Sequence, residues 1–529
     1  MPTSRSRSRG LPQRKLWHES GQAALETARV CVFGSSALAS ESLKNLVLPG
    51  IGEFTVVDDA VVGEQDTLTN FFVQPSDMGK PRAKCIVSGL SELNPDVRGA
   101  SVIRTPAEVL ASCEPSDTEL VSRASLVIAC GLPEAVVHDL GLRCWQQGTP
   151  LLVATAAGFM ASVRTVVSEH AVVESHAEIK QDLRLTAPFP ALLSFANTID
   201  LSTLDPTDLG HVPFVVIIIK ALQKWAADKN LALGVDPIEI PFRQLADIRN
   251  IVIGMAPCSD EENFVEASKN VNANCSACEI PFEVTQILSD PAAAEPKSNG
   301  MADDPADLKG MLPLSGTIPD MKADTKGYIA LQRVYKQRAD EDKAELAKHI
   351  RDVLQAVNLP ECFITQGEVD TYCKNARRLR LLRFTPLHTE IKSGPASTEG
   401  IAYSEALFHY VLFRGSAAFY AAHARYPGAV SSNSNADIDI AELVHSDAME
   451  LETISNGLLA LWGVADQAVP KGLSAEFARS GHDELHNVAS MAGGVIAQEA
   501  IKLITHQYVP ANNLCIIDGA SGKIHVTKV

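Results

Sequence analysis

The stretch RVCVFGSSALASESLKNLVLPGIGEFTVVDD, from Arg29 to Asp59, decides the fold of this chain. A short apolar run ends at Gly34, and apolar residues then recur at helical spacing up to Leu46. A second β-rich run, Phe54 to Val57, ends on Asp58. The pattern predicts strand, turn, helix and strand, which is half of a dinucleotide-type βαβ unit.

The first turn of this unit departs from the pattern that binds nucleotide phosphates. Such a turn normally reads G-x-G-x-x-G, because glycines let the backbone approach a phosphate at the helix N-terminus. Here Gly34 remains, followed by Ser36, Ala37 and Ala39. We expect the nucleotide cradle to be filled in. A purely structural βαβ unit is one alternative, and an NAD-dependent oxidoreductase, which Ser36 and Ala39 disfavour, is another.

Residues 30–90 resemble the adenylation domain of ubiquitin-like-protein activating enzymes and of their bacterial relatives in thiamine and molybdopterin synthesis. The matching residues are KNLVLPGIG (Lys44–Gly52), Asp58 at the end of the second strand, and DMGKPRA (Asp77–Ala83). The resemblance implies an α/β fold, the Rossmann-like adenylation fold of the ThiF and MoeB type.

Most of the nucleotide contacts of that family are missing. Active relatives carry an Asn-Arg-Gln set that holds ATP, and this chain has Thr69 and Asn70 at the positions of the arginine and the glutamine. Pro133 replaces an aspartate that serves magnesium and adenylation, and proline has neither a side-chain oxygen nor an N–H. Asp58, at the ribose position, and Arg82 remain. The resemblance therefore implies an inactive adenylation domain without a cofactor of its own.

Length and composition bound the remaining possibilities. The chain has 529 residues, of which 46% are apolar and 21% charged, and a formal net charge of −18. This length allows two to four domains with ample core. No apolar run approaches the ~20 residues of a membrane helix, and the charge disfavours a nucleic-acid binder. Eleven scattered cysteines suit a reducing compartment, so with the resemblance we expect the cytoplasm and nucleus.

The sequence divides into four expected segments. Residues 1–16 are basic and lack an apolar stretch, which predicts a disordered leader, with an organelle-targeting leader as the alternative. Residues 17–167 form the first part of the α/β domain. Residues 168–480 form a helical insert, resembling the family's catalytic-cysteine domain without that cysteine. Residues 481–529 supply the closing helix and strands. Polar loops are expected at 289–313, 393–400 and 428–437.

Pieces of the insert and of the closing segment resemble the regulatory subunits of neddylation activating enzymes. These pieces are Val172–Pro190, Asp260–Asn272, Gly316–Ala339, Arg425–Gly428 and Glu484–Gly519. The resemblance implies the non-catalytic half of a heterodimer that activates the ubiquitin-like modifier placed on cullins. The catalytic partner would supply the ATP and magnesium site, the thioester cysteine and the domain that recruits the conjugating enzyme. We expect that last domain in the partner because this chain ends soon after its last strand. The corresponding subunit of the SUMO-activating enzyme is the alternative.

The resemblance also implies where the partner binds. Segments Gly50–Thr67 and Tyr328–Glu341 match the family's interface. The residues expected to carry it are Gly50, Ile51, Phe54, Val56, Asp58, Tyr328, Leu331 and Tyr335. In the family, an arginine before the first helix reaches the partner's ATP site, and Arg14 or Arg9 is the candidate here.

The cysteines offer no strong site. Cys275 and Cys278 form a lone C-x-x-C, without the second pair of a structural zinc site. Cys258, Cys362 and Cys373 are candidates for a thioester by location only, and the resemblance gives that cysteine to the partner. We expect no catalytic residue and no metal site in this chain.

Two further motifs have structural interpretations. The run HDELH, from His482 to His486, displaces the glutamate of a metalloprotease motif by one position, and a capped start of the last long helix is the better interpretation. A basic run contains Arg377, Arg378, Arg380 and Arg383, for which a solvated or acid-paired face is favoured over a ligand site.

Overall fold

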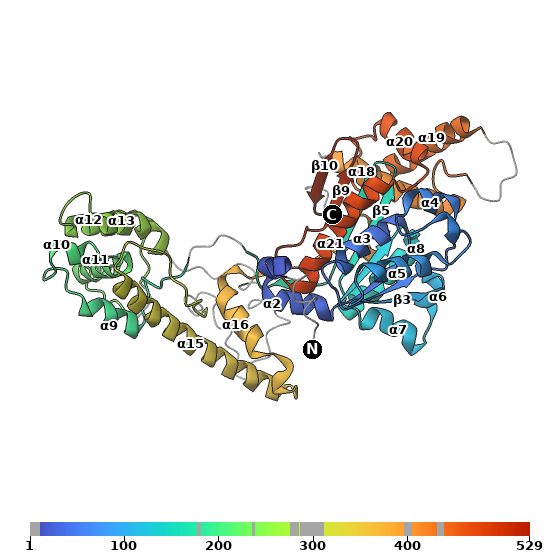
Figure 1. Cartoon of the computed structure of the whole chain (residues 1–529). Coiled ribbons are helices and arrows are strands. Elements are labelled where there is room, and N and C mark those ends of the chain that lie inside the picture. The colour runs from blue at the N-terminus through green and yellow to red at the C-terminus, as the bar shows by residue number, and fades with distance from the viewer. Residues whose placement is uncertain are drawn as a thin grey trace. The chain divides into compact units, whose positions relative to one another are not determined.

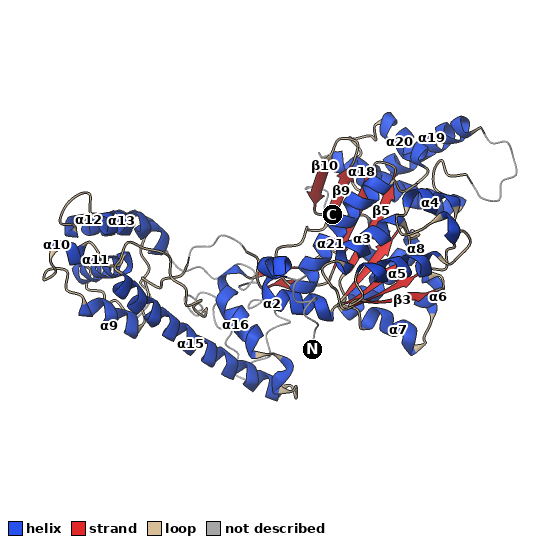
Figure 2. Ribbon diagram, in the orientation of Figure 1, coloured by secondary structure: helices blue, strands red, loops and turns tan. Residues whose placement is uncertain are grey.

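The computed structural model describes residues 11–176, 181–234, 238–275, 285, 312–395, 405–430 and 439–529. The chain forms two compact units, Met1–Ala171 with Leu382–Val529 and Val172–Leu381. Figure 1 follows the chain through the elements of each unit, and Figure 2 shows that the long strands belong to the first unit.

An eight-stranded sheet organises the first unit, in the order β10-β9-β6-β5-β4-β1-β2-β3. Strands β1 to β5 are parallel, and Val30 of β1 lies between Phe54 of β2 and Leu126 of β4. The pairs β5–β6, β6–β9 and β9–β10 are antiparallel. The strands are β1 Arg29–Phe33, β2 Glu53–Val57, β3 Arg98–Val102, β4 Leu126–Cys130, β5 Leu151–Ala157, β6 Met160–Val166, β9 Leu514–Asp518 and β10 Lys523–Thr527. The predicted α/β class is confirmed.

Helices cover both faces of the central strands. In β1, Val30 and Val32 join one core cluster, and Cys31 and Phe33 join the other, because successive side chains of a strand point to opposite faces. One cluster includes α2 Leu11–Thr27, α3 Ala37–Val47, α5 Arg82–Leu93 and α21 His486–Thr505, and the other includes α6 Pro106–Ala111, α7 Pro115–Ser122, α8 Glu134–Gln147 and α17 Leu387–Ser393. Two-sided burial explains why these strands are apolar throughout.

Helix α21 is long and apolar enough to cross a membrane by length and composition alone. Its buried face, which includes Val488, Ala492, Ile496 and Leu503, instead belongs to the same core cluster as α3. A Cβ on Gly493 would lie 2.8 Å from the Cβ of Glu41, so glycine permits this close approach of the two helices. The helix is therefore explained as a core helix of the sheet.

Residues 382–480 differ from the expected division of the chain. The sequence pattern predicts that they belong to the insert, but they fold with the α/β unit, and the second unit is limited to residues 172–381. A core cluster joins Leu407, Leu451 and Phe477 to Ile516 of β9. The helices involved are α18 Glu405–His423, α19 Ile440–Leu461 and α20 Lys471–Ser480. The helical period marks these segments as helices but does not indicate which core they join.

The second unit is helical, as its sequence pattern predicts. The apolar run that follows Pro213 forms the buried helix α11, and Tyr335 and Leu331 of α15 join the same core. Its elements are α9 Pro190–Thr198, α10 Pro206–Leu209, α11 Phe214–Asp228, η2 Phe242–Gln244, α12 Leu245–Met255, α13 Glu262–Asn274, α15 Thr325–Ala356, η4 Glu361–Phe363, α16 Gln366–Asn375 and η5 Ala376–Arg378. Two short strands, β7 His170–Val172 and β8 Arg380–Leu382, pair separately.

The N-terminal boundary also differs from expectation. Helix α2 begins at Leu11, so residues 11–16, placed in the disordered leader, are helical. The helix is broken at Trp17 and His18, and its second part leads directly into β1. Residues 1–10 lie outside the described residues, as do most of the expected loop at 289–313 and parts of those at 393–400 and 428–437.

Candidate functional site

The turn after β1 is where a nucleotide would bind in an active relative, and here its glycine has a structural role. Gly34 has φ +97°, and a Cβ at this position would lie 2.3 Å from the carbonyl oxygen of Cys130 on β4. Only glycine tolerates both conditions. Ala37 and Ala39, which stand where the other glycines would be, are buried in the core around α3. The space that glycines leave for a phosphate is thus filled by packed side chains.

A carboxylate of this chain occupies the N-terminus of α3. The Leu38 N–H donates a hydrogen bond of 2.8 Å to Oε2 of Glu484. Free N–H groups and the helix dipole make this end of a helix an anion site, which phosphate uses in nucleotide-binding relatives of the fold. Burial raises the pKa of Glu484, because desolvation outweighs the hydrogen bond from Leu38. The chain therefore supplies its own carboxyl group as hydrogen-bond acceptor where a nucleotide phosphate would lie.

The segment that carries Glu484 is held in place by backbone pairing. Glu484 forms an isolated parallel bridge with Gly158, whose N–H donates to the carbonyl oxygen of Asp483 at 2.9 Å. Sequence reasoning assigned no role to Glu484. Its only local signal is an acidic residue just before the last long helix, and the partner helix lies more than 400 residues away in the chain.

The two surviving family contacts, Asp58 and Arg82, are committed to each other. The Arg82 guanidinium lies 3.2 Å from Oδ2 of Asp58 and 2.7 Å from Oδ1 of Asp66. Its Nε donates to Oγ of Ser35 at 2.9 Å, and that hydroxyl donates in turn to Asp58. With two carboxylates as partners, the arginine carries no unpaired charge for a phosphate.

The residues that replace the ATP-binding set have structural contacts. Asn70 is buried, and its Oδ1 accepts hydrogen bonds of 3.1 Å from Oγ of Ser40 and from the Phe72 N–H. Oγ1 of Thr69 donates back to the carbonyl oxygen of Gln65 within helix α4 Glu64–Thr69. Pro133 is the N-cap residue of α8. The side-chain oxygens of Asn70 and Thr69 thus take part in the chain's own hydrogen bonds, and Pro133 has no side-chain oxygen to bind magnesium.

Most of the residues expected to contact the partner lie in the chain's own cores. Ile51, Phe54 and Val56 belong to the core of the first unit, and Leu331 and Tyr335 to that of the second. The Tyr335 hydroxyl donates to the carbonyl oxygen of Leu183 at 2.7 Å. These side chains are packed against other residues of the same chain. Asp58 pairs with Arg82, and Gly50 and Tyr328 are half-buried.

The proposed reach-over arginines are only partly placed. Arg14 lies in the first part of α2, and Arg9 lies outside the described residues. The backbone course of α2 therefore leaves both candidates open.

The cysteines fall into two groups. Cys275 and Cys373 are buried, and burial raises the pKa of their thiols to about 12 and about 11. Such thiols are not nucleophiles at neutral pH. Cys258 and Cys362 are exposed, and Cys278 lies outside the described residues. Across the described ranges, no group of three or more histidine, cysteine or acidic side chains could hold a metal ion.

The two histidines of HDELH do not converge. His482 stacks on Tyr426 with ring centroids 3.8 Å apart, and burial lowers the pKa of His482 to about 4. Nδ1 of His486 instead contacts the carbonyl oxygen of Thr69 at 3.1 Å. The expected side-chain cap is also absent at the start of α21, where Leu485 is the N-cap residue. The motif orients the segment that carries Glu484 rather than a metal.

The sequence was compared with models of known protein families. The profile of the ThiF family matches residues 11–529. The chain therefore belongs to the ThiF family. A crystal structure of PaaA matches 31% of this chain and 51% of that chain, with a TM-score of 0.27 and 16% identity.

Curated relatives place the chain more narrowly. The NEDD8-activating enzyme E1 regulatory subunit of Danio rerio is 36% identical over 526 residues, and the match covers 96% of each chain. The NEDD8-activating enzyme E1 regulatory subunit AXR1 of Arabidopsis thaliana is 32% identical over 535 residues, with 98% of this chain and 95% of that protein covered. The chain belongs to the family of NEDD8-activating enzyme E1 regulatory subunits, as the sequence predicts.

Proposed function

We propose that this chain is the non-catalytic half of a heterodimer whose catalytic subunit performs all of the covalent chemistry. That partner binds ATP and magnesium, adenylates NEDD8, carries it as a thioester and passes it to a conjugating enzyme. This chain contributes a folded scaffold that the catalytic subunit requires for activity. The names of the relatives support the regulatory role, and the filled cradle supports the division of chemistry.

The observation that carries this proposal is the Glu484 carboxylate at the start of α3. A triphosphate at the same place would overlap the Glu484 side chain, which already accepts the hydrogen bond of the Leu38 N–H. Arg82 is neutralised by Asp58 and Asp66 and offers no compensation. Both features disfavour binding of ATP to this chain.

Pyrophosphate exchange tests the division of chemistry. The purified chain with NEDD8, ATP and magnesium should give no ATP–pyrophosphate exchange, and exchange should appear when the catalytic subunit is added. Glu484→Ala provides a matched control, since removing the carboxylate does not restore the contacts missing at Thr69 and Pro133. Exchange by the single chain at the rate of the heterodimer would disprove the proposal.

We also propose that the catalytic subunit contacts the exposed apolar side chains that follow β2. Phe54 and Val56 are buried in the core, whereas Val61, Leu68 and Phe71 continue the same region of the chain and are 58%, 74% and 70% exposed. Exposed aromatic and apolar residues of this kind are typical anchors of a protein interface.

Matched aromatic substitutions test this surface. Phe71→Ser should weaken co-purification with the catalytic subunit by about tenfold, the loss expected of a modest interface anchor. Phe242→Ser removes a similarly exposed phenylalanine from the second unit and should leave assembly unchanged. Equal assembly of both variants would exclude this surface.

A further inference from the structure

A small basic pocket lies in the second unit, and no residue of the nucleotide cradle lines it. It has a volume of about 70 Å³, and three segments of the unit line it. These are the end of α16 with η5, the loop before α15, and the residues after 180. The lining residues used below are Gln181, Ser315, Thr317, Lys374, Arg377 and Arg378. At about 30 Å³ for each water molecule, this volume corresponds to about two waters, which is also the scale of one phosphate group.

The charge of the pocket is unbalanced. Its lining holds three cations, Lys374, Arg377 and Arg378, and one carboxylate, Asp182. That carboxylate is shared, since it lies 2.6 Å from Nη2 of Arg377 and 3.6 Å from Nε of Arg184. Within the described part of the chain, no acidic group lies within ion-pair distance of Lys374 or Arg378. Arg377 is thus paired with an acidic side chain, whereas the positive charges of Lys374 and Arg378 are not balanced within the pocket.

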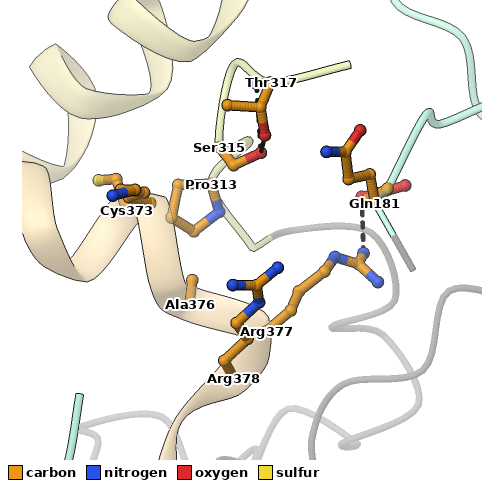
Figure 3. A pocket seen from close by; sticks show the side chains of 10 residues that line it. Gln181, Pro313, Ser315, Thr317, Cys373, Ala376, Arg377 and Arg378 are labelled. Carbon is orange, nitrogen blue, oxygen red and sulfur yellow. Dashed lines mark hydrogen bonds and ion pairs between the residues drawn. The ribbon is translucent and has the colours of Figure 1, made fainter. Parts of the chain in front are cut away.

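Hydroxyl, amide and guanidinium groups of the pocket have hydrogen-bonding capacity that the chain does not use. Oγ of Ser315 and Oγ1 of Thr317 lie 2.8 Å apart, so one hydroxyl proton of this pair is free to donate elsewhere. Nε of Arg377 and Oε1 of Gln181 are buried without a hydrogen-bond partner in the described structure. Figure 3 shows the guanidinium groups of Arg377 and Arg378 directed toward the space that Gln181 and the Ser315–Thr317 loop also face. An arginine fork with hydroxyl donors suits a compact oxyanion with several acceptor oxygens.

We propose that this pocket binds a phosphate group, either as free phosphate or as a phosphomonoester. Three cations and two hydroxyls supply donors on more than one side, which matches a tetrahedral oxyanion better than a planar carboxylate. The site is separate from the nucleotide cradle of the first unit, and it requires no role of this chain in adenylation. It gives the regulatory subunit a place at which a phosphorylated ligand or the phosphate level could act.

Calorimetric titration of the full-length chain tests the site. Inorganic phosphate, O-phosphoserine and acetate are titrated separately, at constant ionic strength maintained with chloride. Saturable binding of phosphate is expected, with weaker binding of acetate. Tighter binding of O-phosphoserine than of phosphate would identify a phosphomonoester as the source, and the reverse order would identify free phosphate.

Three variants locate the binding. Arg378→Gln should weaken phosphate affinity by about tenfold or more, because it removes charge-assisted hydrogen bonds. Lys374→Gln changes an exposed side chain and should also weaken phosphate affinity. It replaces Arg378→Gln as the test if that variant is poorly folded. Arg243→Gln removes an exposed arginine elsewhere in the second unit and serves as the charge-matched control.

Three results would overturn the proposal. The first is the absence of saturable phosphate binding by the unmodified chain. The second is an equal loss of affinity in Arg243→Gln and Arg378→Gln, which would indicate a general charge effect. The third is acetate binding as tightly as phosphate.

Discussion

The side chain of Glu484 accepts a hydrogen bond from the backbone of Leu38 at 2.8 Å, although the two residues are 446 positions apart in the chain. This contact joins the segment before the last helix to the first turn of α3. It places a carboxyl group of the protein at the helix end that would receive a phosphate in a nucleotide-binding relative of the fold. The cradle is therefore held together by a contact of its own, in addition to lacking glycines.

Removing this carboxylate should destabilise the first unit. Glu484→Ala leaves the N–H groups of α3 without their anionic acceptor, and we expect the free energy of unfolding to fall by about 1–3 kcal/mol. Glu484→Gln keeps an acceptor oxygen and should lose less. Urea denaturation of the three proteins measures the difference. Equal stability of Glu484→Ala and the parent chain would contradict the assigned role.

The same residue should contribute to the pH dependence of stability. Burial raises the pKa of Glu484 above its ordinary value of 4.5, so the folded chain binds the proton more tightly than the unfolded chain. This contribution is complete below the unfolded pKa and is lost as pH rises through the folded pKa. From pH 4.5 upward, the free energy of unfolding should decline less steeply for Glu484→Gln than for the parent. If the free energies of unfolding of the two proteins changed with pH in parallel, the raised pKa of Glu484 would be contradicted.

The glycine of the first turn should be required for folding rather than for nucleotide binding. Gly34→Ala places a Cβ against the Cys130 carbonyl oxygen and adds left-handed strain, so we expect a loss of about 2 kcal/mol or more. Gly79→Ala is a matched control, because Gly79 has φ +74° with no atom within 4 Å of the added Cβ. It should cost only the strain of about 1–2 kcal/mol. Thermal unfolding compares the two, and an equal loss would remove the steric argument.

Tyr335 should affect stability more than assembly. Tyr335→Phe removes the hydrogen bond to Leu183 and should cost about 1 kcal/mol, whereas Tyr335→Ala should cost about 3–5 kcal/mol through the cavity it leaves. Folded Tyr335→Phe should bind the catalytic subunit normally. Tyr328→Phe, at the half-buried neighbour, serves as the control. A loss of partner binding by Tyr335→Phe without a loss of stability would instead support a place for Tyr335 in the interface that the family resemblance implies.

The thiols of this chain should not be needed for the thioester. Cys258→Ser and Cys362→Ser change exposed residues and should leave NEDD8 charging by the reconstituted heterodimer unchanged. Cys275→Ala and Cys373→Ala remove buried side chains and should lower stability by about 1 kcal/mol, so charging is compared at equal amounts of folded complex. If one substitution abolishes the reducible thioester but preserves adenylation, that cysteine is catalytic.

Local patterns were sufficient for the elements, and the resemblance of longer motifs to a known family supplied the class of protein. The apolar run before Gly34, the helical spacing up to Leu46 and the β-rich run to Val57 became β1, α3 and β2 within one or two residues. These signals depend on periodicity over a few residues, which the backbone geometry of helices and strands imposes directly. The missing glycines and Pro133 likewise indicated an inactive cradle without reference to any distant residue.

Only the tertiary structure decided which surfaces are buried and what fills the cradle. Ile51, Phe54 and Tyr335 match interface segments of the family by sequence, but they lie in the chain's own cores, since an apolar side chain in sequence does not specify what covers it. Likewise, only the tertiary structure shows that residues 382–480 belong to the first unit, because their helical pattern does not specify which core they join. The contact between Glu484 and Leu38 exists because the fold brings distant segments together, and no local pattern encodes a pairing between residues so far apart in the chain.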